Sequence, residues 1–219
     1  MRRGSPAKRG IDILEESKPK VMTRKSVREA ERHLGERDKV MAELVAKIGP
    51  CALPLRKTPP FHILTASIVS QQLSTKAAET IERRLAAIVP APFEAAGFAG
   101  VAVEKMRGVG LSSAKGRYIL ELAARVRDGR LDLTALAAVP DEAAITALIE
   151  LPGVGRWTAE MFLMFGLHRP DVLSLGDGGL QRAAKLLYGG RAKLANVGKR
   201  WRPYRSVASW YLWRHLEAR

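Results

Sequence analysis

The chain has 219 residues, 47% of them hydrophobic and 27% charged, which excludes a disordered protein and allows a sizeable buried core. Its formal net charge of +15 exceeds what a solvated surface requires and predicts a polyanionic partner, first nucleic acid and second a membrane surface. A single cysteine, Cys51, excludes an intramolecular disulfide and a four-cysteine cluster. Without a membrane-spanning apolar run or a secretory signal, a cytoplasmic, nucleoid-associated protein is expected.

The first half of the chain predicts a basic arm followed by helices. Residues 1–25 mix basic and small residues without periodicity, so a poorly ordered arm is expected. Helical spacing then predicts one helix from Ser26 to Ile48 within an N-terminal segment, residues 26–58. Pro59-Pro60 begin a helix in "PPFHILTASIVSQQ", and Ser74 caps the next one, "STKAAETIERRLAAIV".

The second half continues in the same pattern. Two short helices with glycine breaks are expected in "FEAAGFAG" and "AVEKMRGVG", and a long helix in "SSAKGRYILELAARVRDG", capped by Ser112 or Ser113. Asp141 is expected to cap "DEAAITALIE", before helices in "GRWTAEMFLMFGL", "DGGLQRAAKLLYG" and "RPYRSVASWYLWRHLEA". No segment alternates with period two, so the prediction is an all-α protein of about ten helices.

A Pro-Gly-Val-Gly turn joins two of these helices in "LPGVGRWTAEMFLMF". Its glycines permit a close backbone approach, and the following helix N-terminus favours an anion. The turn therefore predicts a DNA phosphate clamp, whose residues are Gly153, Val154, Gly155, Arg156 and Thr158. The alternative is an ordinary αα-corner in which the glycines serve only the turn.

Several motifs in order resemble one enzyme family. "LPGVGRWTAEMF" and "RPDVLSLGDGGLQRAAK", together with "SIVSQQLS" and "GLSSAKGRYILELA", resemble the helix-hairpin-helix (HhH-GPD) DNA glycosylases. The AlkA type, 3-methyladenine DNA glycosylase II, is the most similar, and the resemblance runs from Pro59 to the C-terminus. It implies two helical subdomains with the active site in the cleft between them. The AlkA type commonly carries an N-terminal β domain, but nothing strand-like precedes Pro59, so a version without this domain is expected.

The resemblance also implies how the chain is divided. Residues 59–167 form a helical-barrel subdomain that contains the hairpin motif, 141–167. Residues 168–219 form a C-terminal subdomain that carries the catalytic aspartate, and residues 26–58 pack against it.

Asp177, in "LGDGGL", matches the family's essential aspartate. Breaking an N-glycosidic bond builds positive charge on the sugar, and a nearby carboxylate stabilises that charge and can activate water. An alkylated purine is already cationic and leaves without a strong acid. The alternative is that Asp177 only caps the next helix. Asp171, six residues earlier, is interpreted as structural.

Trp157 and Trp213 match aromatic positions of the family's base pocket, where indole faces attract a cationic base; ordinary core packing is the alternative. Tyr204 is a weaker pocket candidate, and Met161 stands where the AlkA type has tyrosine. Relatives that also cut DNA carry a lysine at the position of Trp157. The resemblance therefore implies a monofunctional enzyme that leaves an abasic site.

The turn "QQLS" matches the place from which the family fills the gap left by a flipped base. Gln71, Gln72 and Leu73 are the candidates for this wedge, with a polar helix end as the alternative. Arg107 and Lys115 are candidates for phosphate contacts or for simple surface solvation.

No cofactor is expected, and neither an iron–sulfur cluster nor a zinc site is indicated by the spacing of cysteine and histidine. Backbone carbonyls of Ile149, Leu151 and Val154 are candidates for holding a structural Na⁺ or K⁺ at the hairpin. The expected partner is double-stranded DNA containing alkylated bases, bound by a monomer. The rival hypotheses are a glycosylase for a deaminated or oxidised base and a non-catalytic DNA-binding protein.

Overall fold

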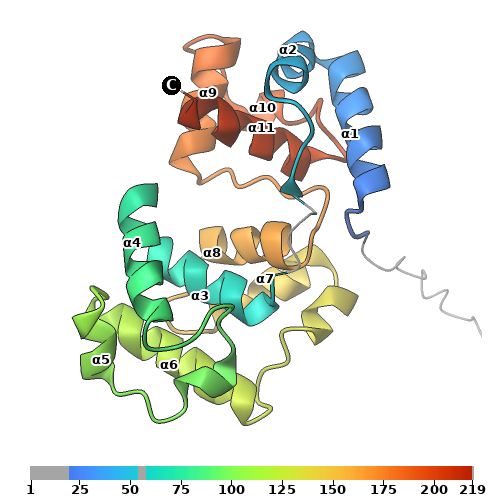
Figure 1. The fold of residues 1–219 in the computed structure, drawn as a ribbon. Helices are drawn as coiled ribbons and strands as arrows, with labels where there is room; N and C mark the ends of the chain where they lie inside the picture. Colours follow the sequence, from blue (N-terminus) through green and yellow to red (C-terminus); the bar gives the residue numbers. More distant parts are fainter. Residues whose placement is uncertain (1–19, 54–57, 219) are drawn as a thin grey trace, which may run out of the picture.

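Two groups of helices make up the part of the chain that the computed structural model describes, residues 20–53 and 58–218. No strand occurs in that part, as the sequence predicts. Figure 1 shows one group above the other. The upper group, called the terminal subdomain below, consists of α1 (Arg24–Arg37), α2 (Lys39–Ile48), α9 (Gly178–Tyr188), α10 (Leu194–Val197) and α11 (Arg205–Glu217).

The lower group, called the hairpin subdomain, takes the middle of the chain. It consists of α3 (Pro60–Ser70), α4 (Thr75–Ala86), η2 (Ala95–Phe98), α5 (Val103–Gly108), α6 (Ser113–Arg127), η3 (Ala135–Ala138), α7 (Asp141–Ile149), α8 (Arg156–Met161) and η4 (Phe162–Gly166). The last of these is a π-helical turn that continues α8. η3 and α10 are short elements that the sequence reading does not predict.

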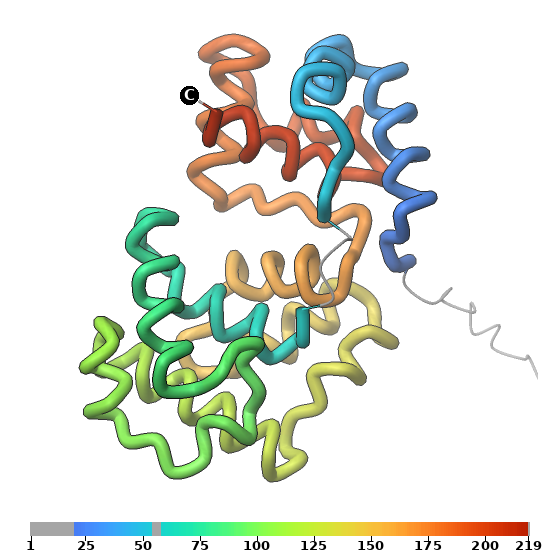
Figure 2. The backbone as a smooth tube through the Cα atoms, in the orientation of Figure 1, coloured from blue at the N-terminus to red at the C-terminus, as the bar shows by residue number. Residues whose placement is uncertain are grey.

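Each subdomain has its own core. Leu64, Ile68 and Phe162 are fully buried in the hairpin subdomain. Leu34, Trp201 and others from both ends of the chain are fully buried together in the terminal subdomain. The N-terminal helices therefore pack against the C-terminal helices, and the chain returns to its starting subdomain after the hairpin (Figure 2).

Side-chain caps set two helix starts where the sequence analysis places them. Ser74 accepts a hydrogen bond from the Ala77 amide at the start of α4, and Ser112 accepts one from the Lys115 amide at the start of α6. The prediction that Asp141 caps its helix is wrong. Asp141 is the first residue of α7, and Pro140 occupies the cap position.

The single helix predicted over Ser26–Ile48 is two helices. α1 begins at Arg24, inside the predicted basic arm, and ends before Asp38. The backbone of Asp38 is extended, with φ −150°, and its carboxylate accepts from the amides of Val40 and Met41 at the start of α2. A capping residue inside a periodic apolar pattern therefore breaks the helix. The rest of the predicted arm, residues 1–19, lies outside the described residues.

Asp38 also ties the terminal subdomain together. Its Oδ2 accepts from the Tyr188 hydroxyl at 2.8 Å and from Trp201 Nε1 at 3.1 Å, and the residue is only 5% exposed. Burial beside this carboxylate raises the pKa of the Tyr188 hydroxyl, so Tyr188 stays a donor at neutral pH.

Two bridges fix the extended segment that links η4 to α9. The buried Arg169 donates to the carbonyls of Leu136, Ala137 and Val139 at the end of η3. Asp171 pairs with Arg205 of α11 at 2.7 Å, which agrees with its interpretation as structural. The link is therefore anchored on both subdomains. None of the helices in residues 20–53 and 58–218 is long and apolar enough to cross a bilayer.

We predict that Asp38→Ala lowers the free energy of unfolding by about 2–4 kcal/mol, because it leaves two buried donors and a helix start without an acceptor. Urea denaturation followed by circular dichroism measures this loss. Asp128→Ala, which removes an exposed carboxylate paired only with Arg130, is the control and should change stability little. Equal stability of both variants would contradict the role of Asp38.

Candidate active site

Two connected cavities lie beside the hairpin. The larger, called the groove, has a volume of about 1310 Å³ and is lined by the α3–α4 turn, α4, the hairpin and residues 176–178. The smaller, called the inner pocket, has a volume of about 530 Å³ and lies between α3, α4, α8, η4 and α11. The cavities share Ser70, Thr75, Glu82, Trp157 and Asp177 in their walls. The inner pocket is therefore bounded by both subdomains.

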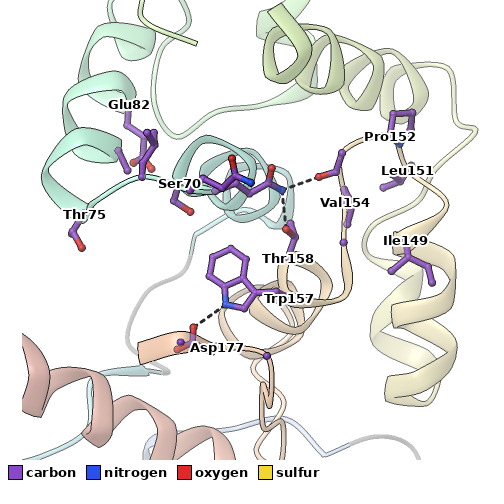
Figure 3. Close-up of a pocket in the computed structure, with 18 of the residues that line it drawn as sticks. Ser70, Thr75, Glu82, Ile149, Leu151, Pro152, Val154, Trp157, Thr158 and Asp177 are labelled. Atoms are coloured by element: carbon purple, nitrogen blue, oxygen red, sulfur yellow. Dashed lines mark hydrogen bonds between the residues drawn. The ribbon is translucent and has the colours of Figure 1, made fainter. Parts of the chain in front are cut away.

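Asp177 stands in this shared wall, and three N–H groups hold its carboxylate. Oδ1 accepts from the Leu180 amide at 2.7 Å, which makes Asp177 the N-cap of α9, and from Trp213 Nε1 at 3.2 Å. Oδ2 accepts from Trp157 Nε1 at 2.8 Å (Figure 3). A carboxylate offers about four lone-pair sites, so one on Oδ2 stays available to a ligand. The two interpretations of Asp177, cap and active-site acid, are compatible.

The loop before Asp177 is held from the hairpin helix. Ser174 is fully buried, and its hydroxyl donates to Oε2 of Glu160 on α8 at 2.5 Å. The Asp177 amide in turn donates to the Ser174 carbonyl at 3.2 Å. Gly179 leaves room for this arrangement, because a Cβ there would lie 3.0 Å from Asp177 Oδ1 and 3.5 Å from the Trp213 ring.

The aromatic residues have a second role that the sequence does not reveal. Trp157 and Trp213 line the inner pocket, and each also donates a hydrogen bond from its indole N–H to Asp177. The Trp213 ring stacks on Phe165, with centroids 5.9 Å apart and an interplanar angle of 30°. Met161 is 5% exposed and contributes its thioether to the same wall.

Tyr204 is not brought to the site. Its ring packs edge-on against His33, at 5.2 Å between centroids, and it lines neither the groove nor the inner pocket. It directly precedes α11 and packs, partly buried, against the core of the terminal subdomain instead.

The two hairpin glycines, Gly153 and Gly155, differ in whether another residue could replace them. Gly153 has φ +78°, in the left-handed region, and a Cβ there would clash with the ring of Tyr118. Gly155 has φ −90°, and a Cβ there would meet nothing within 4 Å. The turn therefore needs Gly153, whereas Gly155 leaves open space in front of α8, whose N-terminus has no side-chain cap.

Two side chains predicted to clamp a phosphate have other partners. The Arg156 guanidinium binds Glu142 at 2.6 Å and Glu160 at 3.1 Å. Thr158 is 2% exposed, and its hydroxyl accepts a hydrogen bond from the Gln71 side chain. The backbone N–H groups of Gly153, Val154 and Gly155 remain as candidates, although the Val154 amide already donates to the Leu151 carbonyl.

The three residues predicted as wedge candidates, Gln71, Gln72 and Leu73, differ in their exposure and contacts. Gln71 donates to the Gly153 carbonyl at 2.8 Å and to Thr158 Oγ1 at 2.9 Å, so it fastens the α3–α4 turn to the hairpin. Gln72 is exposed with φ 57°, and Leu73 is 40% exposed. Gln72 and Leu73 therefore project from the turn, whereas Gln71 is held down.

Lys115 is likewise engaged in the fold. Its ammonium group donates to the carbonyls of Val69 and Gln71 at the end of α3, and burial lowers its pKa. Arg107 is exposed beside the start of α6. Lys115 therefore holds the α3–α4 turn in place.

No group of three or more His, Cys, Asp or Glu residues suited to a metal ion occurs among the described residues. The carbonyl groups proposed for a monovalent cation belong to the hairpin wall of the groove, which contains Ile149, Leu151 and Val154. The Leu151 carbonyl already accepts one hydrogen bond there, from Val154.

Sequence reasoning missed several residues of the inner pocket. Phe165 follows Trp157 and Met161 at successive four-residue steps, a spacing that could have found it. His62 and Glu82 come from α3 and α4, and no local motif marks either. Only the tertiary packing of these helices brings them to the pocket.

Residues 65–200 match the HhH-GPD superfamily of base excision DNA repair proteins, and the chain belongs to this superfamily. Among solved structures, it is similar to the DNA-3-methyladenine glycosidase of Bacillus halodurans, with 40% identity and a TM-score of 0.70. That match covers 85% of this chain and 88% of the other. The fold expected from the resemblance is confirmed.

A second similar structure is the 3-methyladenine DNA glycosylase of Schizosaccharomyces pombe in complex with abasic DNA. It is 28% identical with a TM-score of 0.75, over 86% of this chain and 97% of the other. The Bacillus subtilis protein YfjP is 37% identical over 119 residues, which span 52% of this chain but only 42% of YfjP.

We predict that Gly153→Ala destabilises the protein by at least about 1 kcal/mol, because alanine disfavours a left-handed backbone and its methyl group displaces Tyr118. Thermal unfolding measures the effect. Gly155→Ala is the matched control two residues away, and it should unfold at the wild-type temperature. A stable Gly153→Ala variant would refute the close packing of the hairpin on Tyr118.

Proposed function

We propose that this protein is a monofunctional DNA glycosylase of the 3-methyladenine type. It flips alkylated purines out of duplex DNA, hydrolyses the N-glycosidic bond and leaves an abasic site. The observation that carries this proposal is the position of Asp177 in the wall that the groove and the inner pocket share, where each of its two carboxylate oxygens accepts a hydrogen bond from a different indole N–H.

The groove suits a DNA duplex. The net charge of +15 favours a polyanion, and the open space at Gly155 lets a phosphate approach the uncapped start of α8. Gln72 and Leu73 project from the opposite wall and would fill the gap left by the flipped base. Backbone donors rather than Arg156 or Thr158 make the proposed clamp, and the carbonyls of the same hairpin would hold the Na⁺ or K⁺.

The inner pocket suits a flipped base. Its volume of about 530 Å³ lies within the range of about 300–1,000 Å³ that is typical of small-molecule sites. Trp157, Phe165 and Trp213 give it aromatic walls, and Met161 closes part of it. Aromatic faces attract a cationic, N-alkylated purine more strongly than a neutral base.

Asp177 supplies the chemistry without a cofactor. An alkylated purine carries positive charge, so its bond to the sugar breaks with the base as a neutral leaving group. The charge that develops on the sugar is stabilised by the Asp177 carboxylate, whose orientation three donors have already fixed. The Asp177 carboxylate can also accept a proton from the attacking water.

The rival functions fit these features less well. A DNA-binding protein without activity gains nothing from an acid between the groove and the pocket, since that acid repels phosphate. A glycosylase for oxidised or deaminated bases has a neutral substrate, for which an electron-rich pocket offers less selectivity. The sites, the lesion range and the monomeric state stand as parts of the proposal.

We predict that Asp177→Asn reduces the release of 7-methylguanine from a duplex oligonucleotide by at least about a thousandfold, since asparagine offers no negative charge to the sugar. Strand scission at the abasic site with hot alkali measures the release. Binding to the same duplex should stay within about threefold of wild type. Asp128→Asn is the surface control with unchanged release, and a retained rate in Asp177→Asn would remove this residue from the mechanism.

We predict that borohydride traps no covalent complex between the protein and DNA during base release. A lyase forms a Schiff base through an amine, and no lysine lines either cavity in the described part of the chain. Gel electrophoresis after borohydride reduction detects any covalent protein–DNA complex, and a lysine-dependent glycosylase is the positive control. A trapped band would show that the enzyme is bifunctional.

A further inference from the structure

Glu82 occupies a position at the site that the reaction above does not use. It lies on α4, half-buried, and lines both the groove and the inner pocket. Figure 3 shows it projecting from α4, with Ser70 and Trp157 lying between it and Asp177. A base that leaves the groove for the inner pocket therefore passes between two acids from different subdomains.

Within the described ranges, the Glu82 carboxyl group is unpaired. It forms no hydrogen bond or ion pair with any residue in the described ranges, unlike Asp38, Glu160 and Asp177. Burial, and secondly the neighbouring Glu79, raise its pKa. A half-buried carboxylate without a hydrogen-bond donor lowers the free energy of unfolding. Its position is therefore better explained by an interaction with a ligand than by a contribution to stability.

The described residues give the inner pocket a net negative charge. Arg214 and Glu217 also line it, but they neutralise each other in an ion pair at 2.5 Å. His62 accepts a hydrogen bond from the Phe93 amide on Nδ1, and burial lowers its pKa, so it is neutral at pH 7. Asp177 and Glu82 therefore carry the charge that is left, in a protein whose overall net charge is +15.

We propose that Glu82 is a specificity-determining residue that selects bases carrying a positive charge as they enter the inner pocket. This inference rests on the proposed function and deepens it, because it assigns the choice of substrate to a second acid. Asp177 acts on the sugar, where charge develops during the reaction. Glu82 acts on the base, whose charge is present before the bond breaks and vanishes when the base departs.

The selection is electrostatic. An unpaired carboxylate across a pocket of this size changes the binding of a cation by about tenfold when the intervening dielectric is that of a partly buried site. A neutral base of the same shape gains nothing from that charge. Glutamine keeps the shape and the helix propensity of glutamate but removes the charge, so Glu82→Gln isolates the effect.

The test compares two uncleavable duplexes. One contains 2′-fluoro-7-methylguanosine, a cationic base, and the other contains 2′-fluoro-7-methyl-7-deazaguanosine, which has the same methyl group without the charge. Fluorescence anisotropy gives the ratio of the two Kd values for wild type, Glu82→Gln and Glu79→Gln. Glu79, one turn away on α4, lines the groove but not the inner pocket and is the matched control.

We expect wild type and Glu79→Gln to prefer the cationic base equally and Glu82→Gln to lose about tenfold of that preference. No preference in wild type, an unchanged preference in Glu82→Gln, or an equal loss in both variants would overturn the inference. Failure of the proposed function is a separate result, because it would appear as absent base release by wild type on cleavable 7-methylguanine DNA.

A stability measurement guards against a misfolded variant. The raised pKa means that the folded state favours protonated Glu82, so the charged form destabilises the protein increasingly as pH rises through the ordinary range for glutamate. Glu82→Gln should therefore be at least as stable as wild type at pH 7.5. A less stable variant would show that Glu82 serves the fold and would overturn the inference.

Discussion

The hydrogen bonds to the Asp177 carboxylate join the two halves of the molecule at the site. Trp157 belongs to the hairpin subdomain, whereas Asp177 and Trp213 belong to the terminal subdomain, and donor distances of 2.7–3.2 Å link them. The acid is therefore oriented only when the two cores are docked. The Ser174–Glu160 hydrogen bond also connects the two subdomains next to Asp177. The segment from Leu167 to Gly176 connects them too, through the contacts of Arg169 and Asp171.

The residues around the fixed Asp177 carboxylate differ in what they contact. Hairpin residues line the groove, and the two indoles line the inner pocket and hold the carboxylate. Glu82 lines both cavities and is unpaired among the described residues. Arg156, Gln71 and Lys115 look suited to DNA from their sequence positions. They instead hold the hairpin and the α3–α4 turn in shape. In the proposed reaction, these fixed walls would let a flipped base meet Asp177 in a defined geometry.

Local rules in the sequence were enough to predict the helical class and the caps at Ser74 and Ser112. They failed where a long-range partner decides the outcome. Asp38, where the predicted single helix breaks, also accepts hydrogen bonds from Tyr188 and Trp201, which lie 150 and 163 residues further along the chain. Glu82 and His62 reach the pocket through helix packing alone, and the residues that Gln71 contacts are more than 80 positions away. Motif order predicted where the acid lies, but not what holds it.

Chromatography of bases released from methylated genomic DNA tests the central claim most directly. The purified protein is incubated with DNA treated with a methylating agent, and the soluble fraction is separated and compared with authentic bases. The account predicts that 3-methyladenine and 7-methylguanine appear as free bases, in amounts that rise with time and enzyme, while the DNA accumulates abasic sites. If no methylated purine is released beyond the spontaneous background, the assignment of Asp177 to glycosidic bond hydrolysis is contradicted.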